Sequence, residues 1–157
     1  MNIKKKKIGI LGGSFDPAHK GHLAISKNAK KKFKLKKIIW AITKKNPFKK
    51  ESSTSLFNRI RQCKKIIGKN SYIKVKYYEN LIKSNKTVDL INYFYKNKKN
   101  EIHFLMGADN LVNFHKWHKW KSISEKSKIL VFDRHGYKKK SLNSITFRKL
   151  SQRNLKY

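Results

Sequence analysis

The stretch GGSFDPAHKGH, residues 12–22, constrains the fold of this chain more than any other part of the sequence. It follows a short apolar run at residues 8–11 and precedes a segment, residues 19–34, in which apolar residues are spaced as in a helix among lysines. An apolar run that stops at two glycines and leads into a helix is typical of a buried strand, a close turn and a covering helix. The beginning of the sequence therefore predicts the first strand and helix of an α/β fold.

The alternation of strand-like and helix-like patterns continues along the chain. Five apolar segments predict strands, at residues 7–11, 38–43, 72–75, 102–106 and 128–132. Helices are expected at 19–34, from a cap at Ser53 or Thr54 to Ile67, from a cap at Thr87 to about residue 98, and near 146–150. This order predicts a Rossmann-like, doubly wound parallel sheet of about five strands with helices on both faces. At 157 residues, without repeats or a linker, the chain is one domain by length.

The charge of the chain is extreme, with 41 Lys and Arg against 8 Asp and Glu and a net charge of +33. Most of the excess is lysine, spread from Lys4 to Lys156 without the alternating aromatic residues that stack on nucleic-acid bases. We therefore expect nucleic-acid binding that is at most non-specific. The electrostatic field of this positive charge also attracts small anionic substrates such as nucleotides.

Targeting signals and cysteine content indicate a cytoplasmic protein with no membrane partner. The basic start and the apolar run at 8–11 resemble a signal peptide, but the run ends too early, at Gly12. The apolar runs are too short to span a bilayer. The single cysteine, Cys63, has no internal partner for a disulfide.

The glycine-rich loop has the chemistry of an anion site. Gly12 and Gly13 let a ligand approach the backbone closely, and a helix that starts near His19 points its positive end at the same place. His19 and His22 lie one turn apart on one face and suit a polyphosphate whose charge grows in a transition state. Two other interpretations remain open: surface histidines, or half of a zinc site together with His115 and His118.

A second glycine-bearing loop, Gly107-Ala108-Asp109, follows the fourth apolar segment. In parallel sheets, ligands bind beyond the carboxyl ends of the strands, where the strand order reverses. If the first and fourth strands are neighbours, the two loops meet in one crevice.

The sequence GGSFDPAHKGHL resembles the signature of the nucleotidyltransferases with a His/Thr-x-Gly-His motif, present here as residues 19–22. Within that superfamily the chain resembles the nicotinate-nucleotide adenylyltransferases, which join nicotinate mononucleotide to the AMP part of ATP. Four further stretches carry this resemblance: LMGADNLVNFHKWHKW at 105–120, KTVDL at 86–90, NPFK at 46–49 and VFDRHGY at 131–137.

The resemblance implies a role for each matching residue. Those implied to bind ATP are Gly12, Gly13, Ser14, Phe15, His19, His22, Gly107, Asp109 and Arg134, with the two histidines also acting in catalysis. Those implied to bind nicotinate mononucleotide are Lys49, Thr87, Asp89 and Trp117. Trp117 would stack on the nicotinate ring, although Trp117 and Trp120 are also compatible with a place in the core.

The implied reaction is an in-line displacement at the α-phosphorus of ATP, giving deamido-NAD and pyrophosphate. The family resemblance implies Mg²⁺ bound through substrate phosphates, with no protein ligand. Two alternatives stay open: another nucleotidyltransferase of the superfamily, such as one acting on phosphopantetheine, and a basic nucleic-acid-binding protein on an inactive nucleotidyltransferase shell.

The carboxyl end departs from the family pattern. We assign residues 1–136 to the nucleotidyltransferase domain and 137–157 to a basic tail, an incomplete carboxyl-terminal part of the same domain. Relatives carry a Ser-Ser-Thr-x-x-Arg-like clasp for the ATP phosphates, and SLNSITFR at 141–148 is its nearest counterpart, with different spacing. The expectation is a shortened family member with reduced adenylyl transfer; the alternative is that Ser144, Thr146 and Arg148 replace the clasp.

Overall fold

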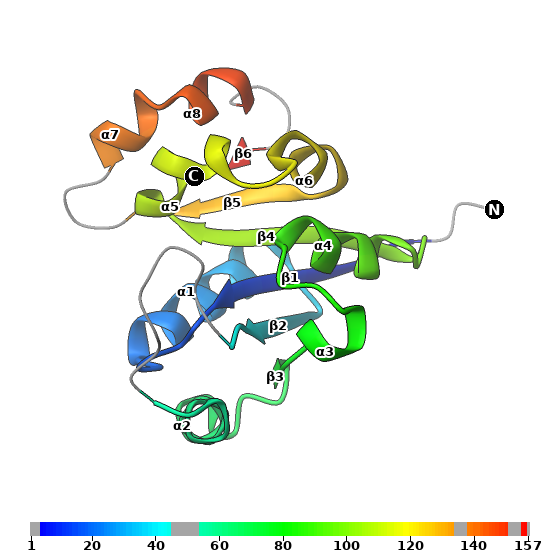
Figure 1. Ribbon diagram of the computed structural model, residues 1–157, viewed down its shortest axis with the longest axis vertical. Helices are drawn as coiled ribbons and strands as arrows, with labels where there is room; N and C mark the ends of the chain where they lie inside the picture. The colour runs from blue at the N-terminus through cyan, green and yellow to red at the C-terminus, as the bar shows by residue number, and fades with distance from the viewer. Residues whose placement is uncertain (1–3, 45–53, 134–137, 151–154, 157) are drawn as a thin grey trace.

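One parallel sheet organises the molecule. The computed structural model describes residues 4–44, 54–133, 138–150 and 155–156, and within them six strands run in the order β3-β2-β1-β4-β5-β6 (Figure 1). The strands are β1 (Lys6–Gly13), β2 (Lys37–Ile42), β3 (Ile73–Lys76), β4 (Asn100–Gly107), β5 (Lys128–Phe132) and β6 (Leu155–Lys156). The five predicted strands are confirmed. Strand β6 was not predicted, because a strand of two residues is too short to show an alternating pattern in the sequence.

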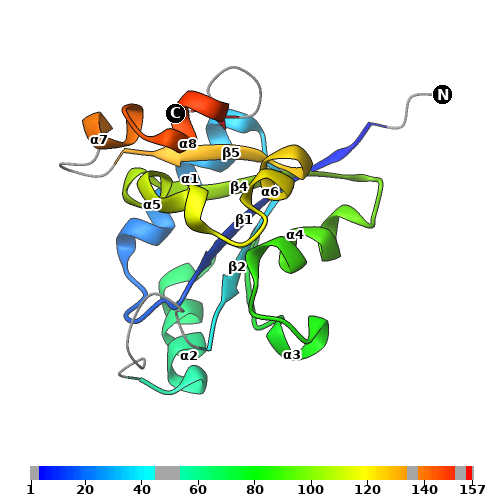
Figure 2. The same ribbon diagram turned by 45° about the horizontal axis from the view of Figure 1, so that its top comes forward.

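Helices cover both faces of this sheet, as predicted (Figure 2). They are α1 (Lys20–Phe33), α2 (Leu56–Ile67), α3 (Glu79–Ile82), α4 (Thr87–Tyr95), α5 (Ala108–Asn113), the 3₁₀ helix η1 (Phe114–Lys116), α6 (Trp120–Lys126), α7 (Lys138–Leu142) and α8 (Ile145–Leu150). Helices α1 and α2 pack on one face, and α4, α5 and α6 pack on the other. The short helices α3, α5, α6 and α7 were not predicted because one or two turns give no clear apolar period.

Strand β2 shows why the buried strands are continuously apolar. Ile39 and Ala41 point into the core beneath α4 and α5, whereas Ile38, Trp40 and Ile42 point into the core beneath α1 and α2. Successive side chains of a strand alternate between faces, so a strand covered on both sides needs apolar residues at every position.

The order of the strands fixes the position of the site. Strand β1 pairs with β2 on one side and β4 on the other. The chain adds β2 and β3 on one side of β1 and then β4, β5 and β6 on the other, so the strand order reverses between β1 and β4. The loops after β1 and β4 therefore leave the same edge of the sheet next to each other, as predicted.

Two helix caps differ from the prediction. Helix α2 is capped by Ser55, whose hydroxyl accepts a hydrogen bond from the Asn58 amide at 3.2 Å, and not by Ser53 or Thr54. Thr54 instead donates its hydroxyl proton to Asp16 at 2.8 Å. Helix α4 has Lys86 at its N-cap, and Thr87 is its first helical residue.

Among the described residues, the helices are all too short or too polar to cross a membrane.

Candidate active site

His19 and His22 form a reciprocal cap at the start of α1. The Nδ1 atom of His19 accepts a hydrogen bond from the Gly21 amide, and the Nδ1 atom of His22 accepts one from the His19 amide, both at 3.1 Å. The pair occupies the places that Ser or Thr and Glu take in an ordinary capping box. The two ring centroids lie 3.9 Å apart.

This cap decides which ring nitrogens carry protons. A backbone amide can only donate, so each Nδ1 must be an acceptor. In the neutral rings the proton therefore lies on Nε2, which makes both imidazoles N–H donors at the atom away from the helix backbone. Two such donors beside a helix N-terminus are suited to binding phosphate oxygens.

Gly21, the residue between the histidines, is required by the position of the His19 ring. A Cβ atom on Gly21 would lie 2.8 Å from two atoms of that ring, closer than real carbon contacts allow. The glycine of His-x-Gly-His thus makes room for the first histidine to fold back over the helix start.

The stacked rings of Phe15 and Trp40 pack against His22. The Phe15 ring lies 4.6 Å from that of His22 and 5.1 Å from that of Trp40, measured between centroids. The Trp40 indole donates to the Ser26 hydroxyl at 2.8 Å, and that hydroxyl donates to the His22 carbonyl at 2.8 Å. Phe15 is buried and has a left-handed backbone with φ 50°. Sequence reasoning missed Trp40 and Ser26, because β2 and α1 meet only in the fold.

The loop after β4 contributes the Gly-x-Asp sequence. Gly107 is the N-cap of α5 with extended backbone, and Asp109 lies in the first turn. The Asp109 carboxylate folds back over Gly107, so that a Cβ on Gly107 would collide with it. This glycine leaves room for the carboxylate that the family resemblance implies for the ATP ribose.

A cavity of about 440 Å³ opens between these loops and α4. Four predicted site residues line it: Gly12, Gly13, Thr87 and Trp117. The other predicted site residues within the described part of the chain do not line it: Ser14, Phe15, His19, His22, Asp89, Gly107 and Asp109. The Asp89 carboxylate accepts the Ser84 hydroxyl at 2.6 Å, and the Ser84 oxygen accepts the Lys86 amide at 3.0 Å. Lys49 and Arg134 lie outside the described residues.

Trp117 belongs both to the core and to the cavity wall. It is half-buried, and its ring meets those of Phe114 and Phe104 edge-on at 5.1 and 6.1 Å. Trp120 packs on the same core, with its ring 6.0 Å from that of Phe114, but does not line the cavity.

Tyr78 and Glu79 also line the cavity, and sequence reasoning missed both. Burial raises the pKa of Tyr78 to about 12. Burial also raises the pKa of Glu79, against the hydrogen bond from the Lys44 amide and the charges of Arg59 and Lys44, which lower it. Tyr78 is the N-cap of α3 and Glu79 is its first residue, and a helix of a single turn gives no sequence period that signals a site.

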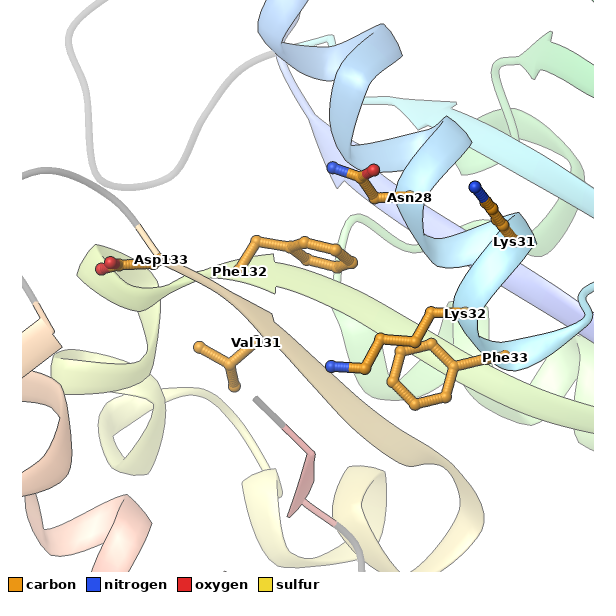
Figure 3. Close-up of a pocket in the computed structure, with 7 residues that line it drawn as sticks. All are labelled: Asn28, Lys31, Lys32, Phe33, Val131, Phe132 and Asp133. Atoms are coloured by element: carbon orange, nitrogen blue, oxygen red, sulfur yellow. The ribbon is translucent and has the colours of Figure 1, made fainter.

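A second cavity of about 650 Å³ lies between the later turns of α1 and the end of β5 (Figure 3). Asn28, Lys31 and Lys32 approach it from α1, and Phe132 and Asp133 approach it from the end of β5. None of the predicted site residues lines it, although Asp133 directly precedes Arg134.

The SLNSITFR segment has a structural role in the fold. The Ser144 oxygen accepts the Phe147 amide at 3.1 Å at the start of α8. Thr146 is fully buried, and its oxygen accepts the His115 amide at 3.1 Å. The Ser144 hydroxyl therefore caps α8, and the Thr146 hydroxyl joins α8 to η1, which leaves the clasp interpretation without support from Thr146.

Metal binding was the alternative interpretation of the histidine pairs. Across the ranges that the structure describes, no three His, Cys, Asp or Glu side chains gather where they could hold a metal ion. The His19–His22 pair is occupied instead with capping α1 through both Nδ1 atoms.

Comparisons with known proteins agree with this geometry. The cytidylyltransferase-like family model matches residues 10–155. The chain is 66% identical to a Pelagibacter ubique protein named "Probable nicotinate-nucleotide adenylyltransferase", over 100% of this chain and 87% of the relative. A protein of the same name from Agrobacterium fabrum is 35% identical over 92% of this chain and 78% of its own length.

A solved structure shows the same fold. It is titled "Plasmodium falciparum nicotinic acid mononucleotide adenylyltransferase complexed with NaAD" and matches with a TM-score of 0.77 and 21% identity, over 88% of this chain and 70% of its own. The fold, the histidine cap after β1 and the full-length match at 66% identity lead to one conclusion. The chain belongs to the nicotinate-nucleotide adenylyltransferases, a family of nucleotidyltransferase enzymes.

Proposed function

We propose that this enzyme transfers the adenylyl group of ATP to nicotinate mononucleotide, giving deamido-NAD and pyrophosphate. The observation that carries the proposal is the His19–His22 cap, which presents two Nε2–H donors at the same sheet edge as a cavity lined by Trp117 and the start of α4. The histidine cap suits a polyphosphate, and the cavity suits an aromatic ring with an anionic substituent.

The reaction needs no covalent intermediate. A phosphate oxygen of the mononucleotide attacks the α-phosphorus of ATP, and the bond from that phosphorus to the oxygen bridging to the β-phosphorus breaks. Pyrophosphate leaves with the electron pair. His19 and His22 donate hydrogen bonds to phosphate oxygens whose charge grows, and the N-terminus of α1 adds its dipole. Most of the rate then comes from positioning and charge stabilisation.

On the ATP side, we assign Gly12, Gly13, Ser14 and Phe15 to the loop around the phosphates and Gly107 and Asp109 to the adenosine. Arg134 remains our assignment for ATP as a whole. Asp109 would accept hydrogen bonds from ribose hydroxyls, since a carboxylate has acceptor sites for two. The bend of its carboxylate over Gly107 supports this role.

On the other side, Trp117 would stack on the pyridinium ring, which an indole face attracts. The N-terminus of α4, with Thr87 in its first turn, would face the carboxylate of nicotinate. Asp89 supports this turn through Ser84. Lys49 remains our assignment for the mononucleotide phosphate.

We assign Mg²⁺ to the ATP phosphates and water, because the described residues offer no cluster of metal ligands. When bound, the ion neutralises phosphate charge. A cytoplasmic location agrees with these substrates and with the single, buried thiol of Cys63.

The test is to mix the protein with ATP, Mg²⁺ and either nicotinate or nicotinamide mononucleotide, and to measure dinucleotide and pyrophosphate. We expect the nicotinate product to form faster. Phosphopantetheine in place of the mononucleotide tests the nearest rival enzyme. Salt-dependent DNA binding without any dinucleotide formation would favour the nucleic-acid alternative.

A further inference from the structure

Arg59 is a buried cation at the back of the glycine-rich loop. It lies in the first turn of α2 with a side chain 1% exposed to solvent. Its guanidinium donates four hydrogen bonds that all end on backbone carbonyls, those of Ser14 at 2.8 Å, Thr43 at 2.6 Å, Lys44 at 2.8 Å and Thr54 at 3.1 Å.

The four carbonyls belong to three separate segments. Ser14 lies in the loop that leaves β1, Thr43 and Lys44 follow β2, and Thr54 precedes α2. One planar group with fixed donor directions therefore sets the distances between these three chain segments. The neighbouring backbone adds one further link, from the Thr43 amide to the Gly13 carbonyl at 2.8 Å.

Stability alone is a poor reason for a buried arginine here. Among the described residues Arg59 forms no ion pair, although its charge lowers the pKa of Glu79. A buried charge is costly to remove from water, and an apolar side chain of similar volume is often as stabilising. What an apolar side chain cannot do is hold three backbone segments at defined distances.

We propose that Arg59 is a positioning residue for adenylyl transfer: its four carbonyl contacts hold the loop from Gly13 to Asp16 in the geometry that binds the ATP phosphates. This inference rests on the proposed function. Within this loop, the buried Arg59 guanidinium fixes the position of the Ser14 carbonyl. Asp16 is held to the same frame through the Thr54 hydroxyl. Arg59 itself is 1% exposed, so it acts through the loop and not as a catalytic residue.

The primary test compares Arg59→Lys with Arg61→Lys. Lysine keeps the charge but donates from one point, so it cannot reach carbonyls of all three segments. Arg61 is an exposed arginine on the same helix and serves as the matched control. We expect kcat of Arg59→Lys to fall about 10²-fold, because displacement of a reacting group by about an ångström has an effect of that size. The Arg61→Lys variant should match the wild type.

Chemical rescue separates positioning from a general structural role. In Arg59→Ala, guanidinium chloride at non-denaturing millimolar concentration can enter the vacated space and restore the contacts. We expect at least a tenfold recovery of kcat, with none from sodium chloride or in Arg61→Ala. Variants that retain normal kcat and KM, or that fail to respond to guanidinium, overturn the proposal. If neither Arg59 variant folds, Arg59 serves stability alone, which also overturns it.

Hydrogen exchange tests the same idea without any turnover. In Arg59→Lys, the amides of the loop from Gly13 to Asp16 and of Thr43 should exchange faster, and ATP should bind more weakly. Unchanged exchange in a folded variant contradicts the proposal. If wild-type protein makes no dinucleotide, the proposed function fails, whereas the exchange and ATP-binding measurements still decide the role of Arg59.

Discussion

The candidate site has two sides, the glycine-rich loop with the start of α1 and the wall formed by α4 and η1. Different interactions hold these two sides in place. On the side of the glycine-rich loop, hydrogen bonds fix the geometry: the reciprocal cap of His19 and His22 and the four carbonyl contacts of Arg59. On the side of α4 and η1, packing places the ring that faces the cavity, with Trp117 edge-on against Phe104 and Phe114, while hydrogen bonds of Ser84 and Thr146 hold the backbone.

This difference follows from what each side must do. Hydrogen bonds are directional, and a site that stabilises developing charge needs donors fixed before the reaction begins. Stacking on a flat ring tolerates more variation in position, so an aromatic wall supported by the core is sufficient. Loss of a polar group on the first side should therefore act on kcat, and loss of an apolar group on the second should act on KM.

The largest expected effect is the loss of an imidazole from the cap. His19→Asn should keep the cap, because asparagine is a good N-cap residue, but should remove the Nε2 donor. We expect kcat to fall about 10²-fold or more, as for a lost donor to developing charge, with little change in melting temperature. His22→Ala should lower kcat by a similar factor. Normal turnover in His19→Asn would mean that His19 only caps the helix.

Trp117→Ala tests the packed side. Stacking on an aromatic side chain is worth about 1–3 kcal/mol, so KM for nicotinate mononucleotide should rise by about 5- to 150-fold. KM for ATP should stay near the wild-type value. Trp120→Ala is the control: it should lower stability without this selectivity, because Trp120 packs on the same core outside the cavity. Equal weakening of both substrates in Trp117→Ala would assign Trp117 to the core alone.

Gly21→Ala separates helix stability from activity. Alanine inside a helix is favoured over glycine by about 0.5–1 kcal/mol, and loss of the His19 cap costs about as much, so the melting temperature should change little. The new Cβ would lie 2.8 Å from the His19 ring and displace it. We expect kcat to fall by about tenfold or more, since misplacement of a reacting group is costly. A variant that is both stable and fully active would show that the ring position does not matter.

The smallest expected effect on activity comes from Thr146→Val. The change keeps the shape but removes the acceptor of the His115 amide, at a cost of about 1–3 kcal/mol in stability for an unsatisfied buried donor. KM for the mononucleotide should rise a few-fold, because η1 leads directly into Trp117. Thr146→Ser keeps the hydroxyl and should restore both properties. An increase in KM for ATP instead would show that the contact between Thr146 and His115 supports the ATP side of the site, which would contradict the comparison.

The sequence by itself determined the features whose causes are local. The five longer strands are readable because each is buried on both faces and therefore apolar at successive positions. The start of α1 is readable because the whole cap lies within residues 19–22. Thr87 shows the limit: its position at the start of α4 was predicted, but the N-cap is Lys86, whose own amide binds the Ser84 hydroxyl.

Only the tertiary structure decided which side chains support the site. Arg59 and Ser14 are 45 positions apart, Thr146 and His115 are 31 apart, and Trp40 and Ser26 are 14 apart. Each contact exists because the strand order β2-β1-β4-β5 brings distant segments together, and no spacing within the sequence records that order. A hydrogen bond of this kind has a partner set by the fold, whereas a helix cap has a partner set by the chain.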